Sequence, residues 1–574
     1  MPRLENFRLL NAVLSPELMK ALSAVVFSVA LFPSVSHAIV DMKNANYSET
    51  WIDVTLTGTG YPLRVNRAYN SRSVFNGMFG FGWCSDFETV IEKLPEGRLK
   101  LTECGAGQEI LYTPAKYDRA TVAKLNEQLI AHYKKKNPQV TAEALETFKT
   151  QLAGSEFMRT EWAKDAGVPA PEAQKGTVYA SDSLAVEQIV FDGSAYTRTL
   201  SDGTLQKFDS NGRVTAFYDK NGNFLKFTYR GNLLNDVTDN NGRKLSFNYY
   251  PNRRIKEILA PGNIRSEYKY KGEDLIEVKN MWKNTYTYQY SETHNLVRIN
   301  FPDKTFKALT YSEKKDWVTS FTYRSIGSGS CVENYVYDMD KENPRDHFWS
   351  IVTKRCGTEI VNESRFEFWH KPNPKGPGKY LSRTLTKSPS DSLDVTYHSE
   401  FGRPLVIKRN GSTTTFEYFP NGLIKEKTTS NARMVFEYKN QYNKVSKVTT
   451  DFFDDKGKAV KRRQTDFSYD NKSNLIAARN SDGQSVRLTY DDRGRIATIA
   501  DQAKKEVMIK YDEKSGKPAQ ITRPKVGTIH VTYKTNGEIN KVDSSDGPTV
   551  AVQIASTFNN LLDIISPATS ELSL

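Results

Sequence analysis

Short runs of alternating apolar and polar residues recur along most of this chain. In the run from Val486 to Tyr490, Val486, Leu488 and Tyr490 occupy alternate positions, with Arg487 and Thr489 between them. A period of two places one set of side chains on the buried face of a β-strand and the other set in water. Asn-Gly and Asp-Gly pairs separate such runs and suit the positive φ angles of tight hairpin turns. The pattern predicts a mostly β protein built from antiparallel hairpins.

Aromatic residues mark a repeat of about 21 residues. The spacing is 20 to 22 residues within each of three series: Phe208, Tyr229, Tyr249, Tyr270, Tyr290 and Tyr311; Tyr397, Tyr418 and Tyr438; and Tyr469, Tyr490, Tyr511 and Tyr533. A single hairpin is only marginally stable in water, so we expect successive hairpins to pair edge to edge into one long sheet. Because sheets twist, this sheet should curl into a spiral that encloses its apolar face.

Two groups of motifs make the sequence similar to the Rhs/YD-repeat family. The segments that start at Tyr218 and Tyr490 follow the Y-D-x-x-G-R/N signature of that family, through Tyr218, Asp219 and Gly222 and through Tyr490, Asp491, Gly494 and Arg495. An N-terminal stretch resembles the domain that opens Rhs proteins (DUF6531-like), through Arg67, Tyr69, Asn70, Ser71, Arg72, Gly80, Gly82 and Trp83. The resemblance covers roughly residues 46–113 and 190–545.

The resemblance implies a hollow YD shell in which these motif residues are structural. Such shells either enclose a C-terminal toxin or resemble surface proteins that bind glycans or other cells. The closing motif and the Asp-Pro autocleavage site of a toxin-bearing core are not found in this sequence. An autonomous toxin is therefore not expected.

Changes in pattern divide the chain into six expected segments. They are an N-terminal extension with a signal peptide (1–38), an Rhs-type N-terminal β domain (39–113), a helical insertion (114–176), return strands of the N-terminal domain (177–200), a YD-repeat β shell (201–547) and a C-terminal tail (548–574). The signal is indicated by Lys20, the apolar run 21–32 and small residues at Ser36 and Ala38. Translation from Met19 would give this signal a conventional start.

The helical insertion has apolar residues at helical spacing. Pro138 should separate two helices, and Thr141 should cap the second. An αα-hairpin that decorates a loop, a plug for the end of the shell and a partner-binding lobe all remain open. Two further interruptions are expected to be a hairpin extended by ten residues at 451–463 and a surface turn at 372–377.

The four cysteines favour two local disulfides in an oxidising compartment. Cys331 and Cys356 lie nine residues on either side of the polar loop 340–347, so they should face each other across one hairpin. Cys84 and Cys104 flank a turn around Gly97 less symmetrically. Buried free thiols are the alternative.

Composition and motif searches exclude several function classes. Hydrophobic residues make up 38% of the chain, mean hydropathy is −0.59, and the charge of +13 is spread along the strands, so neither nucleic-acid binding nor a transmembrane anchor is expected. Motifs of zinc proteases, serine hydrolases, phosphate loops and Cys-x-x-Cys sites are not found. Asp219, Asn221 and Asn223 start a calcium-loop pattern, but its required Gly and Glu are missing. We predict no catalytic, cofactor-binding or metal-binding residues.

The expected function is that of an exported, non-enzymatic YD-repeat shell or scaffold in the periplasm, at the cell surface or secreted. Exposed tyrosines and basic side chains would bind a glycan or an envelope protein. The alternative is a partial Rhs cocoon in a polymorphic toxin-delivery system, with an encapsulated or neighbouring polypeptide as its partner.

Overall fold

The computed structural model describes residues 39–545, except 57, 104–107, 183–185, 326–328, 375–377, 440–442, 504 and 534–538, together with positions 550, 553, 554, 556 and 564. The expected signal peptide at 1–38 and Cys104 lie outside the described residues, as does most of the tail.

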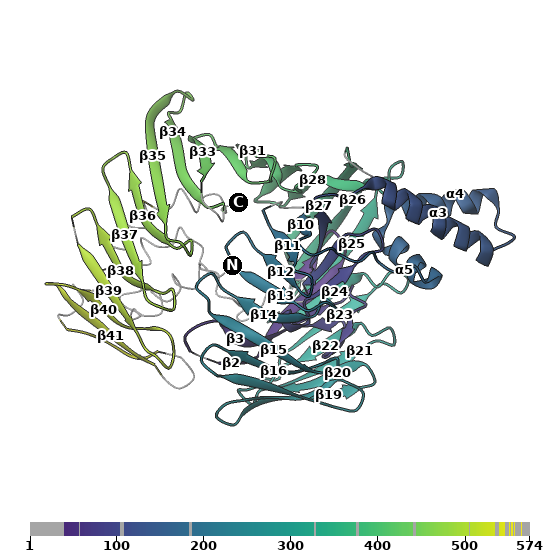
Figure 1. Cartoon of the computed structure of the whole chain (residues 1–574), viewed down its shortest axis with the longest axis horizontal. Helices are drawn as coiled ribbons and strands as arrows, with labels where there is room; N and C mark the ends of the chain where they lie inside the picture. The colour runs from purple at the N-terminus through teal and green to yellow at the C-terminus, as the bar shows by residue number, and fades with distance from the viewer. Residues whose placement is uncertain are drawn as a thin grey trace.

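One antiparallel strip of 36 strands forms most of the fold (Figure 1). Each strand from β8 to β42 pairs with the strand that precedes it in the sequence. The strands of the strip are β7 (Val90–Lys93), β8 (Leu99–Glu103), β9 (Gln108–Pro114), β10 (Val178–Ser181), β11 (Gln188–Phe191), β12 (Tyr196–Thr199), β13 (Leu205–Phe208), β14 (Val214–Tyr218), β15 (Phe224–Arg230), β16 (Leu233–Asp239), β17 (Lys244–Tyr249), β18 (Ile255–Ala260), β19 (Ile264–Lys271), β20 (Asp274–Lys279), β21 (Thr285–Tyr290), β22 (Leu296–Asn300), β23 (Phe306–Tyr311), β24 (Val318–Ser325), β25 (Gly329–Met339), β26 (His347–Cys356), β27 (Glu359–Pro372), β28 (Lys379–Lys387), β29 (Ser392–Tyr397), β30 (Pro404–Arg409), β31 (Ser412–Tyr418), β32 (Ile424–Thr428), β33 (Ala432–Tyr438), β34 (Val445–Phe453), β35 (Ala459–Tyr469), β36 (Leu475–Asn480), β37 (Ser485–Tyr490), β38 (Ile496–Asp501), β39 (Glu506–Tyr511), β40 (Pro518–Arg523), β41 (Gly527–Tyr533) and β42 (Ile539–Ser544).

The strip curls, which confirms the predicted spiral sheet. Its first strand returns onto a later one: Val90 of β7 forms a bridge with Arg213, and the Ile91 N–H donates to the Gly212 carbonyl (2.9 Å). Gly212 has φ +80°, and a Cβ there would lie 1.9 Å from the Ile91 oxygen. Only glycine fits this close approach, so this position helps to set the curl.

A small N-terminal sheet lies inside the first coil of the strip, where its purple strands run between teal ones (Figure 1). It consists of β1 (Ile39–Asp41), β2 (Asn46–Leu56), β3 (Leu63–Asn70) and β6 (Trp83–Cys84), followed by the 3-10 helix η1 (Asp86–Glu88). A two-stranded ribbon, β4 (Asn76–Gly77) and β5 (Gly80–Phe81), accompanies it. We call β1 to β6 the plug. Its side chains share one hydrophobic core with the strip up to β26.

The boundary expected at residue 200, between the N-terminal domain and the YD shell, does not separate two sheets. Strands β7 to β9 and β10 to β12 belong to the same strip as the YD repeats, because β9 pairs with β10 across the insertion and β12 pairs with β13. The pairing of β10 with β9 agrees with the expected return of residues 177–200 to the N-terminal domain, whereas the continuation of the same sheet from β12 into β13 was not expected.

The insertion contains three helices rather than the predicted two: α3 (Arg119–Lys136), α4 (Ala142–Gly154) and α5 (Glu156–Ala166). Thr141 caps α4 as predicted, and its hydroxyl accepts from the Ala144 N–H (3.2 Å). Ser155 ends α4 and caps α5, so one residue separates these helices. They project from the outside of the strip (Figure 1). The interpretation of the insertion as an end plug is therefore wrong.

The remaining interruptions follow the predicted pattern. Strands β34 and β35 form the expected long hairpin, which turns at Asp454 and Gly457. The expected surface turn follows the end of β27 at Pro372, although residues 375–377 lie outside the described part of the chain.

Candidate functional site

The YD signature forms the hairpin turns. The Asp491 Oδ1 accepts from the backbone N–H groups of Arg493 (3.0 Å) and Arg495 (2.9 Å), while its Oδ2 accepts from the Arg495 Nε (2.7 Å). Gly494, at φ +77°, donates its N–H to the Asp491 carbonyl (2.9 Å). The aspartate thus satisfies the turn's free donors and pairs with the residue four positions later.

The earlier signature is built in the same way. Asp219 accepts from the backbone N–H groups of Asn221 and Asn223 (both 2.9 Å) and from the Asn223 side chain (2.7 Å), and Gly222 adopts φ +90°. Tyr218 precedes the turn, with the Lys207 ammonium 5.4 Å from its ring centre. These carboxylate bonds account for the D-x-N-x-N run as a turn.

The repeating tyrosines fasten neighbouring hairpins. Tyr490 stands at a register shift near the end of its strand, and its phenol donates to the main-chain carbonyl of Leu475, about one hairpin earlier (2.8 Å). The same bond is made by Tyr229, Tyr249, Tyr290, Tyr311, Tyr418, Tyr438, Tyr469, Tyr511 and Tyr533. Burial raises the pKa of Tyr418 to about 12, so this phenol remains a donor. These tyrosines are half-buried and pack against the hydrophobic cores, on the face that the curled sheet was expected to enclose.

Arg67 is the centre of the contact between the plug and the strip. It is fully buried, and its guanidinium donates to both Asp53 oxygens (2.8 and 3.2 Å) and to the Tyr288 hydroxyl (3.0 Å). The guanidinium also lies 4.1 Å from the centre of the Trp83 ring system. Burial alone would lower the pKa of Arg67, but the Asp53 carboxylate outweighs this effect and raises it. The Tyr268 hydroxyl donates to Asp53 (3.0 Å) and completes the network.

The other motif residues of the plug support the same contact. Tyr69 is buried, and its hydroxyl accepts from the Leu296 N–H (2.9 Å), while the Trp83 Nε1 donates to the Tyr290 hydroxyl (2.8 Å). Gly82, at φ +75°, lies so close to Tyr69 that a Cβ would be 2.8 Å from its ring. The motif therefore carries the plug's attachment to β21 and β22.

The loop after β3 extends this attachment. The Asn70 side chain accepts from the Arg72 N–H (3.1 Å), and the Arg72 guanidinium donates to the Lys315 carbonyl (2.7 Å). Ser71 accepts from the Tyr47 N–H (2.9 Å). Gly80 adopts φ +97°, and the residue after it donates its N–H to the Glu273 carbonyl.

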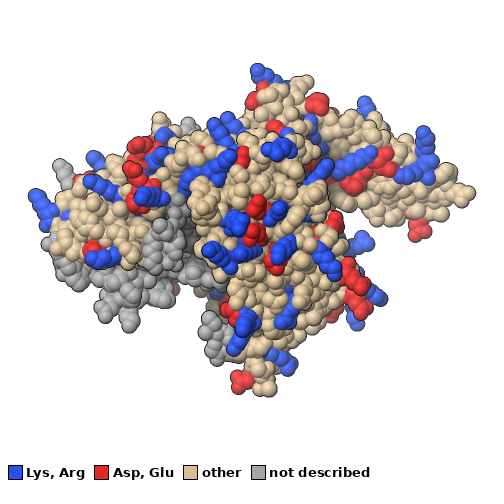
Figure 2. Space-filling view, turned by 90° about the horizontal axis from the view of Figure 1, so that it is seen from below, with Lys and Arg blue, Asp and Glu red and all other residues tan. Residues whose placement is uncertain are grey.

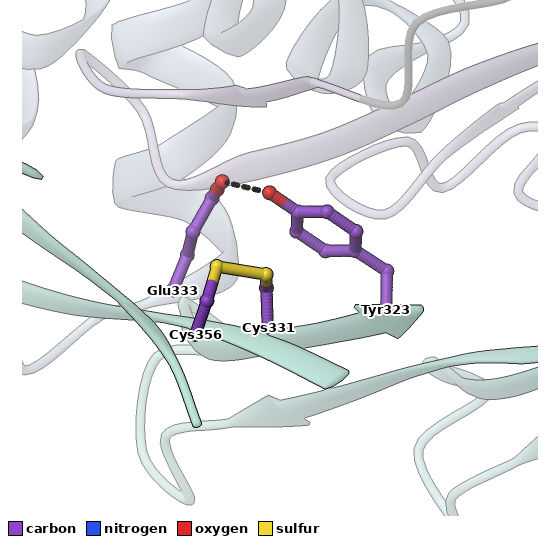
Figure 3. Close-up of a disulfide and its surroundings, with 4 residues drawn as sticks. All are labelled: Tyr323, Cys331, Glu333 and Cys356. Atoms are coloured by element: carbon purple, nitrogen blue, oxygen red, sulfur yellow. Dashed lines mark hydrogen bonds between the residues drawn. A yellow bond between two sulfur atoms is a disulfide. The ribbon is translucent and has the colours of Figure 1, made fainter. Parts of the chain in front are cut away.

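The predicted disulfide between Cys331 and Cys356 is present and joins directly opposed residues of β25 and β26 (Figure 3). Beside it, Glu333 accepts from the hydroxyls of Tyr323 (2.9 Å) and Tyr335 (2.7 Å). Burial, assisted by Glu333, raises the pKa of Tyr323, so this phenol is a neutral donor. Cys84 is buried in β6, and its predicted partner Cys104 lies outside the described residues.

The outer face of β26 to β28 carries a cluster of aromatic and basic side chains. Ring contacts and guanidinium stacking gather Trp349, Trp369, His347, Arg365 and Arg383: the His347 and Trp369 rings stack at 4.7 Å, and the two arginines lie 4.5 and 4.7 Å from the tryptophan rings. We call this set the tryptophan patch. The residues next to the tryptophans in sequence, Ser350 and Phe368, are buried on the opposite face.

The described surface shows no large patch of one charge on the face in Figure 2. Basic and acidic side chains are interspersed on the face shown in Figure 2. Among the described residues, no three His, Cys, Asp or Glu side chains are placed to hold a metal ion. None of the described helices is long and apolar enough to cross a membrane.

Sequence reasoning missed the polar centre of the plug, although a signal was present. Arg67 stands in phase with Leu63, Val65 and Tyr69, all buried, and Asp53 interrupts an apolar run in β2. A charged residue at a buried position of an alternating strand requires a partner. One partner, Tyr288, lies on a strand more than 200 residues later, so this pairing could not be predicted from the sequence.

Comparison with known proteins adds two family matches. Residues 38–112 match a domain of unknown function, DUF6531, and residues 379–507 and 452–573 match the teneurin YD-shell family. A search of curated proteins finds no significant match.

Similar solved structures are much longer chains. The Tc holotoxin pore of Photorhabdus luminescens is 12% identical over 86% of this chain and 29% of its own, with a TM-score of 0.37. A TcdB2-TccC3-Cdc42 structure is 12% identical over 93% of this chain and 31% of its own, also with a TM-score of 0.37. This chain spans about a third of their length.

The curled strip of hairpins, the aspartate turns at the YD signatures and the two family matches agree with one another. Together they support an Rhs/YD-repeat protein, in which a segment similar to DUF6531 precedes strands similar to the teneurin YD shell.

Proposed function

We propose that this protein is an exported, non-enzymatic shell component that holds a polypeptide against the inner face of its strip. The main support for this proposal is that this face already binds two segments of the chain itself, the N-terminal plug and residues of the C-terminal tail. The plug is seated by Arg67 and its aromatic neighbours, and Val550, Ile554 and Ile564 are buried against the apolar side chains of β31 to β41. Apolar packing with a few buried polar anchors is the chemistry by which proteins bind other polypeptides.

The proposal of export is supported by two features. The apolar run at 21–32 follows Lys20 and precedes small residues, as in signal peptides. The Cys331–Cys356 disulfide joins adjacent strands, and disulfides persist in oxidising compartments. Mass spectrometry of exported protein tests both features: loss of residues 1–38 and resistance of Cys331 and Cys356 to alkylation without reductant are expected.

The proposal that the protein is not an enzyme is supported by the roles of its inner carboxylates. Asp53 pairs with Arg67, Glu49 with Lys307, and Glu333 accepts from two phenols. Each of these carboxylates is engaged in joining strands, and acid–base catalysis needs a carboxylate directed at a substrate.

Site-specific photocrosslinking tests the inner-face proposal. Benzoylphenylalanine would replace either Tyr397, whose hydroxyl contacts Thr384 on the inner face, or its neighbour Thr396 on the outer face. Each full-length chain would be co-expressed with the products of neighbouring genes. Crosslinks from position 397 but not from 396 are expected. Crosslinks only from 396, or none with any neighbouring product, would overturn the proposal.

The tryptophan patch favours a second candidate function, the binding of an envelope glycan on the outer face. Tryptophan rings stack on sugars, and the adjacent Arg365 and Arg383 supply hydrogen-bond donors. A glycan array probed with wild type and with Trp349→Ala/Trp369→Ala tests it. The matched control is Trp282→Ala, an exposed tryptophan outside the patch. Signal lost only with the patch variant supports glycan binding, and no signal with wild type removes this candidate.

A further inference from the structure

The strip is divided into two bodies with separate hydrophobic cores. One core joins the plug to the strands up to β26, and the other joins β31 to β41 with the described residues of the tail. We call β10 to β26 the N-terminal wall and β32 to β42 the C-terminal wall. Between them, Phe368 and Val395 are buried but belong to neither core. Each wall is thus stabilised internally.

The two walls also meet away from the strands that join them, along a line that we call the seam. The seam is formed by the plug loop at residues 58–60 and by turns of the N-terminal wall at 201–204 and 219–223 on one side, and by turns of the C-terminal wall at 443–444, 470–474, 491–495 and 512–517 on the other. All but the first are hairpin turns of the repeat.

The contacts at the middle of the seam are hydrogen bonds. The Lys220 Nζ donates to the Ser473 carbonyl (2.8 Å), and the Asn474 side chain donates to the Asn221 side chain (2.9 Å). Asn223 donates to a main-chain carbonyl of the turn that follows β37 (3.0 Å). Ser473, Asn474 and Asn223 are all buried although they are turn residues. The seam therefore has a matched polar surface on each side.

Similar contacts continue in both directions. The Lys444 Nζ donates to the Ser201 carbonyl (2.9 Å). At the other end, Gly516 lies so close to the plug loop that a Cβ would be 2.6 Å from the Gly58 carbonyl oxygen. No hydrophobic core residue of one described wall is clustered with the core of the other.

The hydrogen bonds across the seam stabilise the closed shell less than apolar burial stabilises each wall. A hydrogen bond exchanged with water contributes about 0.5–1.5 kcal/mol, whereas opening a wall would expose many apolar side chains at once. Separation along the seam leaves both hydrophobic cores intact. Strands β28 to β31 remain as the covalent and hydrogen-bonded link, at the top of Figure 1.

We propose that the seam is the opening of the shell, with the C-terminal wall swinging away from the N-terminal wall about strands β28 to β31. A polypeptide would then pass between the walls to reach the inner face. Passage of a polypeptide rests on the proposed function, whereas the opening does not and is tested by itself.

Cysteine reactivity measures the opening. Ser473→Cys places a thiol at a position that the seam buries, and Ser266→Cys places one beneath the plug, where the serine hydroxyl donates to the Asp53 carbonyl. Each full-length chain would be labelled with a maleimide mass tag, and wild type would give the background. Because local opening needs less free energy than unfolding, Ser473→Cys should react faster than Ser266→Cys.

Charge reversal then loosens the seam. Lys220→Glu/Lys444→Glu removes two donors to carbonyls across it, and the control Lys256→Glu/Lys510→Glu makes the same charge change at exposed strand positions. The seam variant should accelerate labelling of Ser473→Cys at least about tenfold and leave Ser266→Cys unchanged. A second reporter, Ser515→Cys, guards against a local effect at Ser473.

The outcomes are distinct. Acceleration at both seam reporters, absent from the control variant and at Ser266→Cys, supports the opening. Equal acceleration at Ser266→Cys would mean general unfolding, and no acceleration at either seam reporter would mean that the walls do not separate there. Either result overturns the proposal.

Discussion

Replacing Arg67 tests whether the plug is held by its buried ion pair. Arg67→Met keeps much of the side chain's volume but leaves the Asp53 carboxylate buried, with hydrogen bonds from Tyr268 and none from a cation. It also removes the cation stacked on Trp83. The N-terminal sheet should therefore loosen from the strip while the C-terminal wall, which has its own core, is unaffected.

The expected loss can be estimated from the network. Breaking one partner of a buried pair costs about 3–5 kcal/mol because the other charge stays buried without compensation. Arg67→Met/Asp53→Asn removes both charges, so it should cost less than Arg67→Met alone. Arg64→Met is the matched control, because Arg64 is an exposed position of the same strand.

Hydrogen exchange resolves the effect along the chain. Amides of β2 and β3 should exchange faster in Arg67→Met by a factor that corresponds to about 3 kcal/mol or more, with protection partly restored in the double variant. Amides of β36 to β41 should be unchanged. A loss under about 1 kcal/mol, or a double variant worse than Arg67→Met, would refute the idea that this pair holds the plug.

Three further outcomes are expected. Tyr490→Phe should lower the free energy of unfolding of the C-terminal wall by about 1 kcal/mol, the contribution of one hydrogen bond to the Leu475 carbonyl, as measured by urea denaturation. Reduction of the Cys331–Cys356 disulfide, which spans 25 residues, should destabilise the protein by about 3 kcal/mol, as measured by melting with and without reductant. Burial raises the pKa of Glu88 to about 7, so the folded protein binds its proton more tightly than the unfolded chain does. Stability should therefore fall as pH rises from about 4.5 to 7, and Glu88→Gln should remove this part of the pH dependence, which amounts to at most about 3 kcal/mol.

Each of these three predictions can be refuted by its own measurement. An unchanged urea midpoint for Tyr490→Phe would remove the tyrosine bond as a stabilising element. Identical melting of oxidised and reduced protein would mean that the strand pairing alone holds β25 against β26. For Glu88, parallel stability profiles of wild type and Glu88→Gln between pH 4.5 and 7 would show that the carboxyl titrates normally.

Much of the strip could be predicted from turn residues and from the alternation of apolar and polar positions. Asn-Gly and Asp-Gly pairs specify turns by their backbone preferences, and alternation specifies which face of a strand is buried, so the hairpins and the repeat follow from residues close together. The Cys331–Cys356 pairing was readable for the same reason, because both residues belong to one hairpin. The third helix escaped notice because Ser155 ends α4 and starts α5 without a proline or a loop.

The candidate surfaces were less accessible to sequence reasoning. The tyrosines of the repeat could be located but not interpreted, since a phenol at a strand end could face water or, as here, a carbonyl one hairpin earlier. The tryptophan patch required the register of β26 to β28, which brings His347 opposite Trp369. Pairing across long strands with register shifts is not fixed by alternation alone.

By itself, the sequence determined the hairpin unit, its period and its turn chemistry, because these depend on interactions within a few tens of residues. Only the tertiary structure decided that the plug lies inside the first coil, that Arg67 finds Asp53 and Tyr288, and that Lys220 meets Ser473 across the seam. These contacts join residues separated by up to 253 positions. They depend on the accumulated twist and curl of many strands, and a small change per strand would bring different residues together.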